Sequence, residues 1–100
     1  MNNWIGEKMK KSELVEAIAS SAGVTKADTS RVLDTFIATV TDALRNGHDV
    51  VLPGFGSFSV GNRSARTGRN PQTGKTIQIP ASRVPRFKSG KNLKEAVQEA

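Results

Sequence analysis

The sequence predicts an α+β fold: two N-terminal helices, a three-stranded antiparallel sheet with a long protruding β-ribbon arm, and a short C-terminal helix. Three observations predict it. Apolar residues keep helical spacing from residue 12 to residue 44, the period shortens to that of strands after Gly47, and residues 61–76 hold almost no apolar side chain. A chain of 100 residues supports one domain.

The two predicted helices each have a start and a stop signal. Ser12 is the expected N-cap of the first helix and Gly23 its stop, around an apolar stripe of Leu14, Val15, Ile18, Ala19 and Ala22. Thr25 with Asp28 is a capping-box variant that predicts the second helix, and Asn46-Gly47 ends it. The second stripe is broader, with Val32, Leu33, Phe36, Ile37, Val40, Ala43 and Leu44.

Short strands are predicted next, over residues 48–52 and 55–60, separated by the turn residues Pro53-Gly54. Alternation returns at Ile77 and Ile79 and continues to Val84 and Phe87. Ser89-Gly90 then precedes a last short helix whose buried face is expected to hold Leu93, Ala96 and Val97.

The polar stretch between these strands, about residues 61–76, is predicted to be the arm. Ala65 is its only hydrophobic residue, so it cannot bury a core. Residues 70–74, Asn-Pro-Gln-Thr-Gly, are typical of a turn, which places the tip of a long hairpin near Pro71. Arg63, Arg66 and Arg69 recur every third residue, a spacing that does not hold one face of a flat strand, so a strong twist or a bulge is expected if all three meet one groove.

The positive charge is concentrated in this half of the chain. The formal net charge is +6, yet residues 50–94 contain no acidic residue and nine basic ones. The rest of the chain has six basic residues and all nine acidic ones. A basic half beside a weakly acidic half indicates a protein that meets a polyanion with one part of its surface.

Catalysis and membrane insertion have little support in the sequence. There is no cysteine, and the single histidine, His48, follows a helix stop, where a solvent-facing strand start is expected. No metal-ligand spacing or phosphate-binding loop occurs, so we expect no enzyme, no metal and no cofactor. The apolar runs are far shorter than the ~20 residues of a membrane helix.

DNA is the polyanion that suits a coreless two-stranded ribbon, since such a ribbon fits a DNA groove and arginines favour the narrow minor groove. A proline at the tip is a candidate wedge between base pairs. Two rivals remain open at this point. One is a sequence-specific regulator that reads the major groove with its helix pair, although the second helix offers only Lys26, Arg31 and Arg45 as cations. The other is a module that binds anionic membrane or polysaccharide.

The segment Gly54-Phe55-Gly56-Ser57-Phe58, followed by Arg63, Arg66, Gly68, Arg69, Asn70, Pro71 and Thr73, resembles the signature of the bacterial histone-like HU/IHF family. The resemblance covers Met9 to Val97 and is closer to HU than to integration host factor. It implies an intertwined dimer with a helical base, a saddle of strands, and two arms that reach around double-stranded DNA in the minor groove. The implied function is DNA bending and compaction in the bacterial nucleoid, within the cytoplasm; an integration-host-factor-like, sequence-specific regulator is the alternative.

The resemblance also assigns roles to residues. Pro71 is implied to be the intercalating wedge. The implied DNA-binding residues are Lys11, Arg63, Arg66, Arg69, Asn70, Pro71, Gln72, Thr73, Lys75, Arg83, Lys91 and Lys94. The chain departs from the family pattern in two places. Residues 1–8 precede the usual start and are either a natural extension or an added remnant, so the DNA-binding domain is expected over residues 9–100. Gly61 occupies a position where many relatives have a longer, often basic side chain. Its lack of a side chain is expected to remove one contact and loosen the strand.

The apolar residues predict an obligate dimer. Without the arm the body is small, and small domains are marginal alone. Its large apolar residues exceed what one short helix and a small sheet can cover, so we expect a core shared with an identical subunit, or with a paralogue, made of Phe36, Ile37, Val40, Leu44, Phe55, Phe58 and Phe87.

Overall fold

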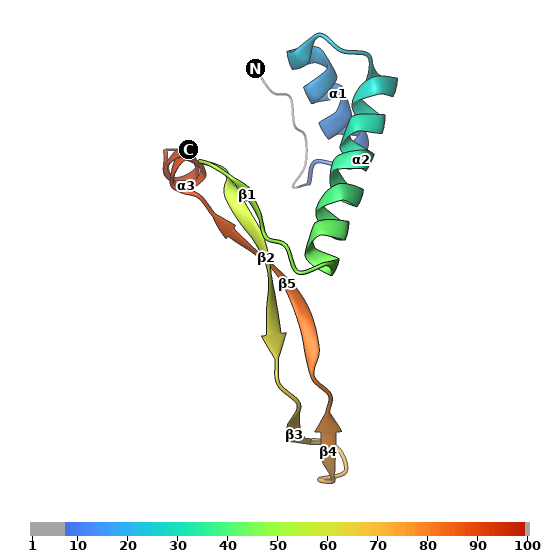
Figure 1. Ribbon diagram of the computed structural model, residues 1–100, viewed down its shortest axis with the longest axis vertical. Helices are drawn as coiled ribbons and strands as arrows, with labels where there is room; N and C mark the ends of the chain where they lie inside the picture. Colours follow the sequence, from blue (N-terminus) through green and yellow to red (C-terminus); the bar gives the residue numbers. More distant parts are fainter. Residues whose placement is uncertain (1–7, 100) are drawn as a thin grey trace. The chain divides into compact units, whose positions relative to one another are not determined.

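The computed structural model describes residues 8–99 (Figure 1). Its elements, in chain order, are α1 (Lys11–Ala22), α2 (Lys26–Arg45), β1 (Val50–Leu52), β2 (Gly56–Arg63), β3 (Arg66–Arg69), β4 (Thr76–Ile79), β5 (Ser82–Ser89) and α3 (Lys91–Gln98). This order confirms the predicted α+β fold of two helices, an antiparallel sheet and a C-terminal helix. The predicted extension, residues 1–8, lies outside the described residues except for Lys8. The chain divides into two compact units, one ending at Thr39 and one beginning at Val40, which are described in turn.

Helix α1 begins two residues earlier than the sequence suggested. Lys10, not Ser12, is the N-cap, and Ser12 lies inside the helix. The reason is local: the Lys10 backbone N–H donates to the Glu13 carboxylate over 3.1 Å, so an acidic side chain within the helix supplies the capping interaction. The predicted stop is confirmed, since Gly23 adopts the left-handed conformation with φ of 69° and the Val24 N–H donates to the Ala19 carbonyl.

The start of α2 follows its sequence signal. The Thr25 hydroxyl oxygen accepts the Asp28 backbone N–H at 3.1 Å, as an N-cap residue does. The helix ends at Arg45, and Gly47 has a φ of 81°, so the predicted Asn46-Gly47 stop is also confirmed. Burial in the helical unit is slight: in this unit, as far as it is described, only Val15, Ala19 and Thr29 count as buried.

The second unit is built on a three-stranded antiparallel sheet in the order β1-β2-β5. Its register pairs Phe58 with Phe87 and Val60 with Pro85, and the two phenylalanine rings lie 5.0 Å apart between centroids. Side chains alternate along a strand, so the face that holds these residues also holds Arg83. We call it the apolar face. The opposite, polar face carries residues 57, 59, 61 and 63 of β2 and residues 82, 84, 86 and 88 of β5.

The arm is a separate two-stranded ladder of β3 and β4, whose register pairs Arg66 with Ile79 and Arg69 with Thr76. Strands β2 and β5 lead directly to this ladder, which lies at the far end of the hairpin in Figure 1. Two breaks separate the ladders, at residues 64–65 and 80–81. The boundaries differ from the predicted 61–76, because residues 61–63 pair within the main sheet while Ile77 and Ile79 belong to the arm.

Helix α3 is fixed to the turn between β1 and β2. The Gly90 N–H donates to the Phe55 carbonyl at 2.8 Å and the Leu93 N–H to the Gly54 carbonyl at 3.1 Å. A Cβ at Gly90 would lie 2.8 Å from the Gly54 oxygen, so only glycine allows this approach. Within residues 8–99, no helix is both long enough and apolar enough to cross a membrane.

Candidate nucleic-acid interface

The tip of the arm is a turn organised by Asn70. Its side-chain oxygen accepts the backbone N–H groups of Gln72 at 2.9 Å and of Thr73 at 3.4 Å. Its own N–H donates to the Lys75 carbonyl at 2.9 Å, and Gly74 has a φ of 71°. These bonds use the Asn70 side chain to hold the turn. Pro71 is left exposed in the loop that joins β3 to β4, in line with the predicted position of the tip.

The arm exposes cations on both of its faces. Arg66 shares a face with Gly68 and with the isoleucines of β4, whereas Arg69 lies on the other face. A Cβ at Gly68 would lie 2.9 Å from the Ile79 side chain, so the isoleucines lie over this glycine. The arm therefore has a small apolar cluster on one face, where the sequence suggested none. A groove that enclosed the arm would contact an arginine on each of its two faces.

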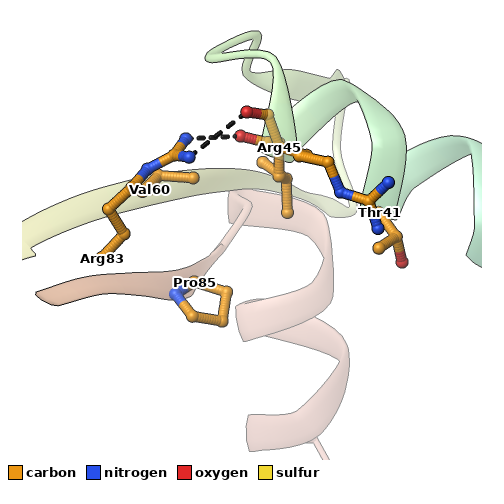
Figure 2. Close-up of a pocket in the computed structure, with 6 residues that line it drawn as sticks. Thr41, Arg45, Val60, Arg83 and Pro85 are labelled. Carbon is orange, nitrogen blue, oxygen red and sulfur yellow. Dashed lines mark hydrogen bonds between the residues drawn. The ribbon is translucent and has the colours of Figure 1, made fainter.

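Arg83 lies beside the end of α2 rather than on the polar face. Its guanidinium donates to the Leu44 carbonyl at 3.0 Å and to the Arg45 carbonyl at 3.2 Å, as Figure 2 shows. These are the last two carbonyls of the helix, which have no partner within it. Arg83 and the end of α2 line a shallow pocket together with Val60 and Pro85. Two of the five N–H groups of Arg83 are thus occupied in capping the helix, a role that sequence spacing could not indicate.

The other predicted contact residues differ in how free their charges are. Lys11 forms an ion pair with Asp34, and Nζ of Lys91 lies 4.0 Å from Oε1 of Glu95. Among the described residues no carboxylate pairs with the remaining predicted cations, which are Arg63, Arg66, Arg69, Lys75 and Lys94. The structure brings Arg66, Arg69 and residues 70–75 together in the arm, while Arg63 closes β2 at its base and Lys91 and Lys94 are in α3.

Two cations on the polar face were absent from the predicted set, Arg86 and Lys88. The register aligns Lys88 with Ser57 and Arg86 with Ser59, and Arg63 lies further along the same face, opposite Ser82. The alternation around Phe87, flanked by Arg86 and Lys88, was the signal available in the sequence. Strands β1, β2 and β5 contain no acidic residue, so every charge that they place on this face is positive.

Metal-binding clusters do not appear in the part of the chain that the structure describes. No group of three or more histidine, cysteine, aspartate or glutamate side chains lies together there. The His48 backbone N–H donates to the Ala43 carbonyl at 2.8 Å and so helps to close α2.

Comparison with curated proteins finds close relatives along nearly the whole chain. DNA-binding protein HU-beta from Serratia marcescens is 60% identical over 89 residues, which cover 89% of this chain and 99% of the relative. HU-beta from Escherichia coli K12 is 56% identical over the same shares. DNA-binding protein HU 1 from Bacillus subtilis is 53% identical, covering 89% of this chain and 97% of the relative.

The solved structures and the family match agree with these relatives. A structure described as an Anabaena HU–DNA cocrystal superimposes with a TM-score of 0.84 at 46% identity, covering 92% of this chain and 100% of the other. HU from Thermotoga maritima gives a TM-score of 0.65 at 38% identity, covering 89% of this chain and 98% of that one. The family model described as bacterial DNA-binding protein matches residues 9–98. This chain therefore belongs to the bacterial DNA-binding protein family, the HU/IHF family, and is closer to HU.

Proposed function

We propose that the protein is an architectural DNA-binding protein of the bacterial nucleoid that bends duplex DNA largely without regard to its sequence. The observation that carries this proposal is the arm, which has exposed arginines on both faces and an exposed proline at its tip, on a sheet with no acidic residue. Similarity to HU proteins, one of them solved with DNA, supports it.

Two steps make up the proposed mechanism. Lysines and arginines of the arm, the polar face and α3 neutralise phosphates and release counterions, which gives affinity that does not depend on sequence. The arm then enters the minor groove, and Pro71 wedges between two base pairs at a cost of a few kcal/mol for unstacking. Preference among sites follows from how easily the DNA bends, so nicked, pre-bent and flexible duplexes bind best.

The proposed working unit is a dimer of identical subunits. Large apolar side chains that the single chain leaves exposed support this part, among them Phe36 at 42% and Phe55 at 49% exposure. Apolar residues of α1, of α2 and of the turn between them also line an open hollow, with Ile18, Val24, Val32 and Phe36. A second subunit would cover these surfaces and carry a second arm.

The decisive experiment measures binding to linear, nicked and pre-bent duplexes of matched sequence across a salt series, with heparin as competitor. We expect tighter binding to the nicked and pre-bent duplexes and a steep loss of affinity with salt. Equal affinity for all three duplexes would contradict the bending mechanism. Strong preference for one base sequence on linear DNA would identify the alternative, a sequence-specific regulator like integration host factor.

Arginines 66 and 69 provide a second test of the same mechanism. Replacing either with alanine removes a phosphate-binding charge without touching a base-reading group. We expect binding to weaken about equally on unrelated sequences, and the slope of the salt dependence to become less steep by about 0.9 for each phosphate that is no longer neutralised. A variant that failed to bind at one sequence only would argue against this assignment.

A further inference from the structure

The side chain of Arg86 lies across the strand from its own position, over Gly61. If Gly61 carried a Cβ, that atom would lie 2.7 Å from Nη2 of Arg86 and closer still to its Nε and Cζ. The guanidinium therefore occupies the space that any side chain at position 61 would fill. Arg86 is paired with Ser59 in the register and Gly61 with Val84, so Arg86 reaches diagonally to the next pair of residues on the polar face.

This diagonal reach changes the spacing of charge on the polar face. Three residue pairs on the polar face contain a cation: Ser57–Lys88, Ser59–Arg86 and Arg63–Ser82. The Gly61–Val84 pair lies between the two pairs that contain arginine and has no cation of its own. Paired positions on one face recur about every 7 Å along a strand. With its guanidinium over Gly61, Arg86 supplies a charge to the pair that lacks one, and the cations form a line from Lys88 toward the arm.

The Arg86 charge is also available to a ligand. Arg86 is an exposed residue, and across the described residues it forms no ion pair with a carboxylate. Strands β1, β2 and β5 hold no acidic residue that could compete for it. The planar guanidinium of arginine carries several N–H donors, an arrangement that favours contacts with phosphate oxygens.

We propose that Gly61 and Arg86 form a matched pair: the missing side chain at position 61 positions the Arg86 guanidinium as a phosphate-binding group on the polar face. The expected loosening of the strand at Gly61 is thereby offset, because the glycine makes room for a cation from the neighbouring strand. This inference rests on the proposed DNA-binding function and adds a residue to it.

The test is a double-mutant cycle read by the salt dependence of binding to a linear duplex. Arg86→Ala should weaken binding about fivefold to tenfold near 0.1 M salt. It should also make the slope of the logarithm of the binding constant against the logarithm of the salt concentration less steep by about 0.9, as the removal of one phosphate-neutralising charge does. Gly61→Ala keeps every charge but displaces the guanidinium, so it should lower the slope to a similar degree. The double variant should be no worse than Arg86→Ala alone. Additive effects of the two substitutions, or an unchanged slope in Arg86→Ala, would overturn the pairing.

If Gly61→Ala fails to fold, a second experiment that moves the positive charge from position 86 to position 61 tests the same proposal. In an Arg86→Ala background, Gly61→Lys returns a cation to the same place on the polar face, and the slope should recover. Asn62→Lys in that background is the matched control, since it adds the same charge one residue away on the opposite face. Equal recovery by both lysines would refute a positional role for the Gly61–Arg86 pair.

The wild-type measurement separates the two proposals. Wild-type protein that shows no salt-dependent binding to duplex DNA would refute the proposed function and this inference together. Wild-type binding with no effect of Arg86→Ala would refute the inference alone. Arg31→Ala removes the same charge from an exposed arginine of α2 paired with Asp28, and it should leave the slope within error of the wild type.

Discussion

At the scale of single residues, Pro71 is the side chain to which the proposed mechanism assigns the kink. It is exposed in the tip turn, and its ring is rigid and apolar. Pro71→Ala should reduce the DNA bend more than the affinity, because the phosphate contacts remain while the wedge is removed. Energy transfer between dyes at the two ends of a duplex measures the bend. Equal energy transfer with the wild type and the variant would contradict the assignment of Pro71 as the wedge.

Arg83 is a predicted DNA-binding residue for which the structure indicates a role in stability. Its guanidinium donates to the Leu44 and Arg45 carbonyls at the end of α2. Hydrogen bonds to a charged group contribute more than neutral ones, and a cation at a helix C-terminus adds to that. Arg83→Ala should lower the free energy of unfolding by about 1–2 kcal/mol. Urea denaturation at a fixed protein concentration measures the change.

Arg63→Ala is the matched control for that measurement. It removes the same charge from the paired strand, but Arg63 has no carboxylate partner among the described residues and lies on the opposite face. A surface change of this kind should alter stability by less than about 0.5 kcal/mol. Equal destabilisation by both variants would show that charge, and not the helix cap, determines the effect.

At the scale of elements, the arm depends on its turn. The Asn70 side-chain oxygen holds the N–H groups of Gln72 and Thr73, so Asn70→Ala should free both amides and loosen the tip. Asn70→Asp keeps the acceptor and is the matched control. Hydrogen exchange of the Gln72 amide should be faster in Asn70→Ala than in wild type and close to wild type in Asn70→Asp. Unchanged exchange in Asn70→Ala would mean that the turn forms without this side chain.

Helix ends and element order could be predicted from sequence because their causes are local. Gly23 and Thr25 act within a few residues of themselves, and the structure confirms both predictions. The predicted Ser12 cap is wrong because the Glu13 carboxylate serves the Lys10 N–H instead. The predicted sheet is right in kind, but the breaks at residues 64–65 and 80–81 depend on pairing between strands distant in sequence.

The candidate binding surface is less predictable than the fold for the same physical reason. The arm could be predicted because its lack of apolar residues and its turn motif are contiguous in the chain. The capping contact of Arg83 joins residues 38 and 39 positions apart, which no local pattern reveals. The alternation around Phe87 could place Arg86 on the polar face, but the position of its guanidinium could not be predicted, because that depends on the empty space over Gly61 on the neighbouring strand.

At the scale of the whole molecule, the single chain buries little apolar surface. Among the described residues no large side chain is fully buried, and Phe36, Ile37, Phe55 and Phe87 are each 42–52% exposed. Folding must offset roughly 1–2 kcal/mol of backbone entropy for each ordered residue, chiefly by burying apolar surface. The exposed apolar set coincides with much of the predicted dimer core, which supports a core completed by a second subunit.

That proposal predicts that stability depends on protein concentration. The Tm of wild-type protein should rise with concentration, because dilution favours the unfolded chains over the dimer. Phe36→Ala should lower the free energy of unfolding by about 3–5 kcal/mol, the range for a buried phenylalanine. If the ring stayed 42% exposed, as in the single chain, roughly half of that loss would be expected. Val51→Thr, a change of similar shape at a side chain 65% exposed on the polar face, is the control and should cost less than about 1 kcal/mol. A folded monomer in analytical ultracentrifugation at low micromolar concentration, with a Tm independent of concentration, would refute the shared core.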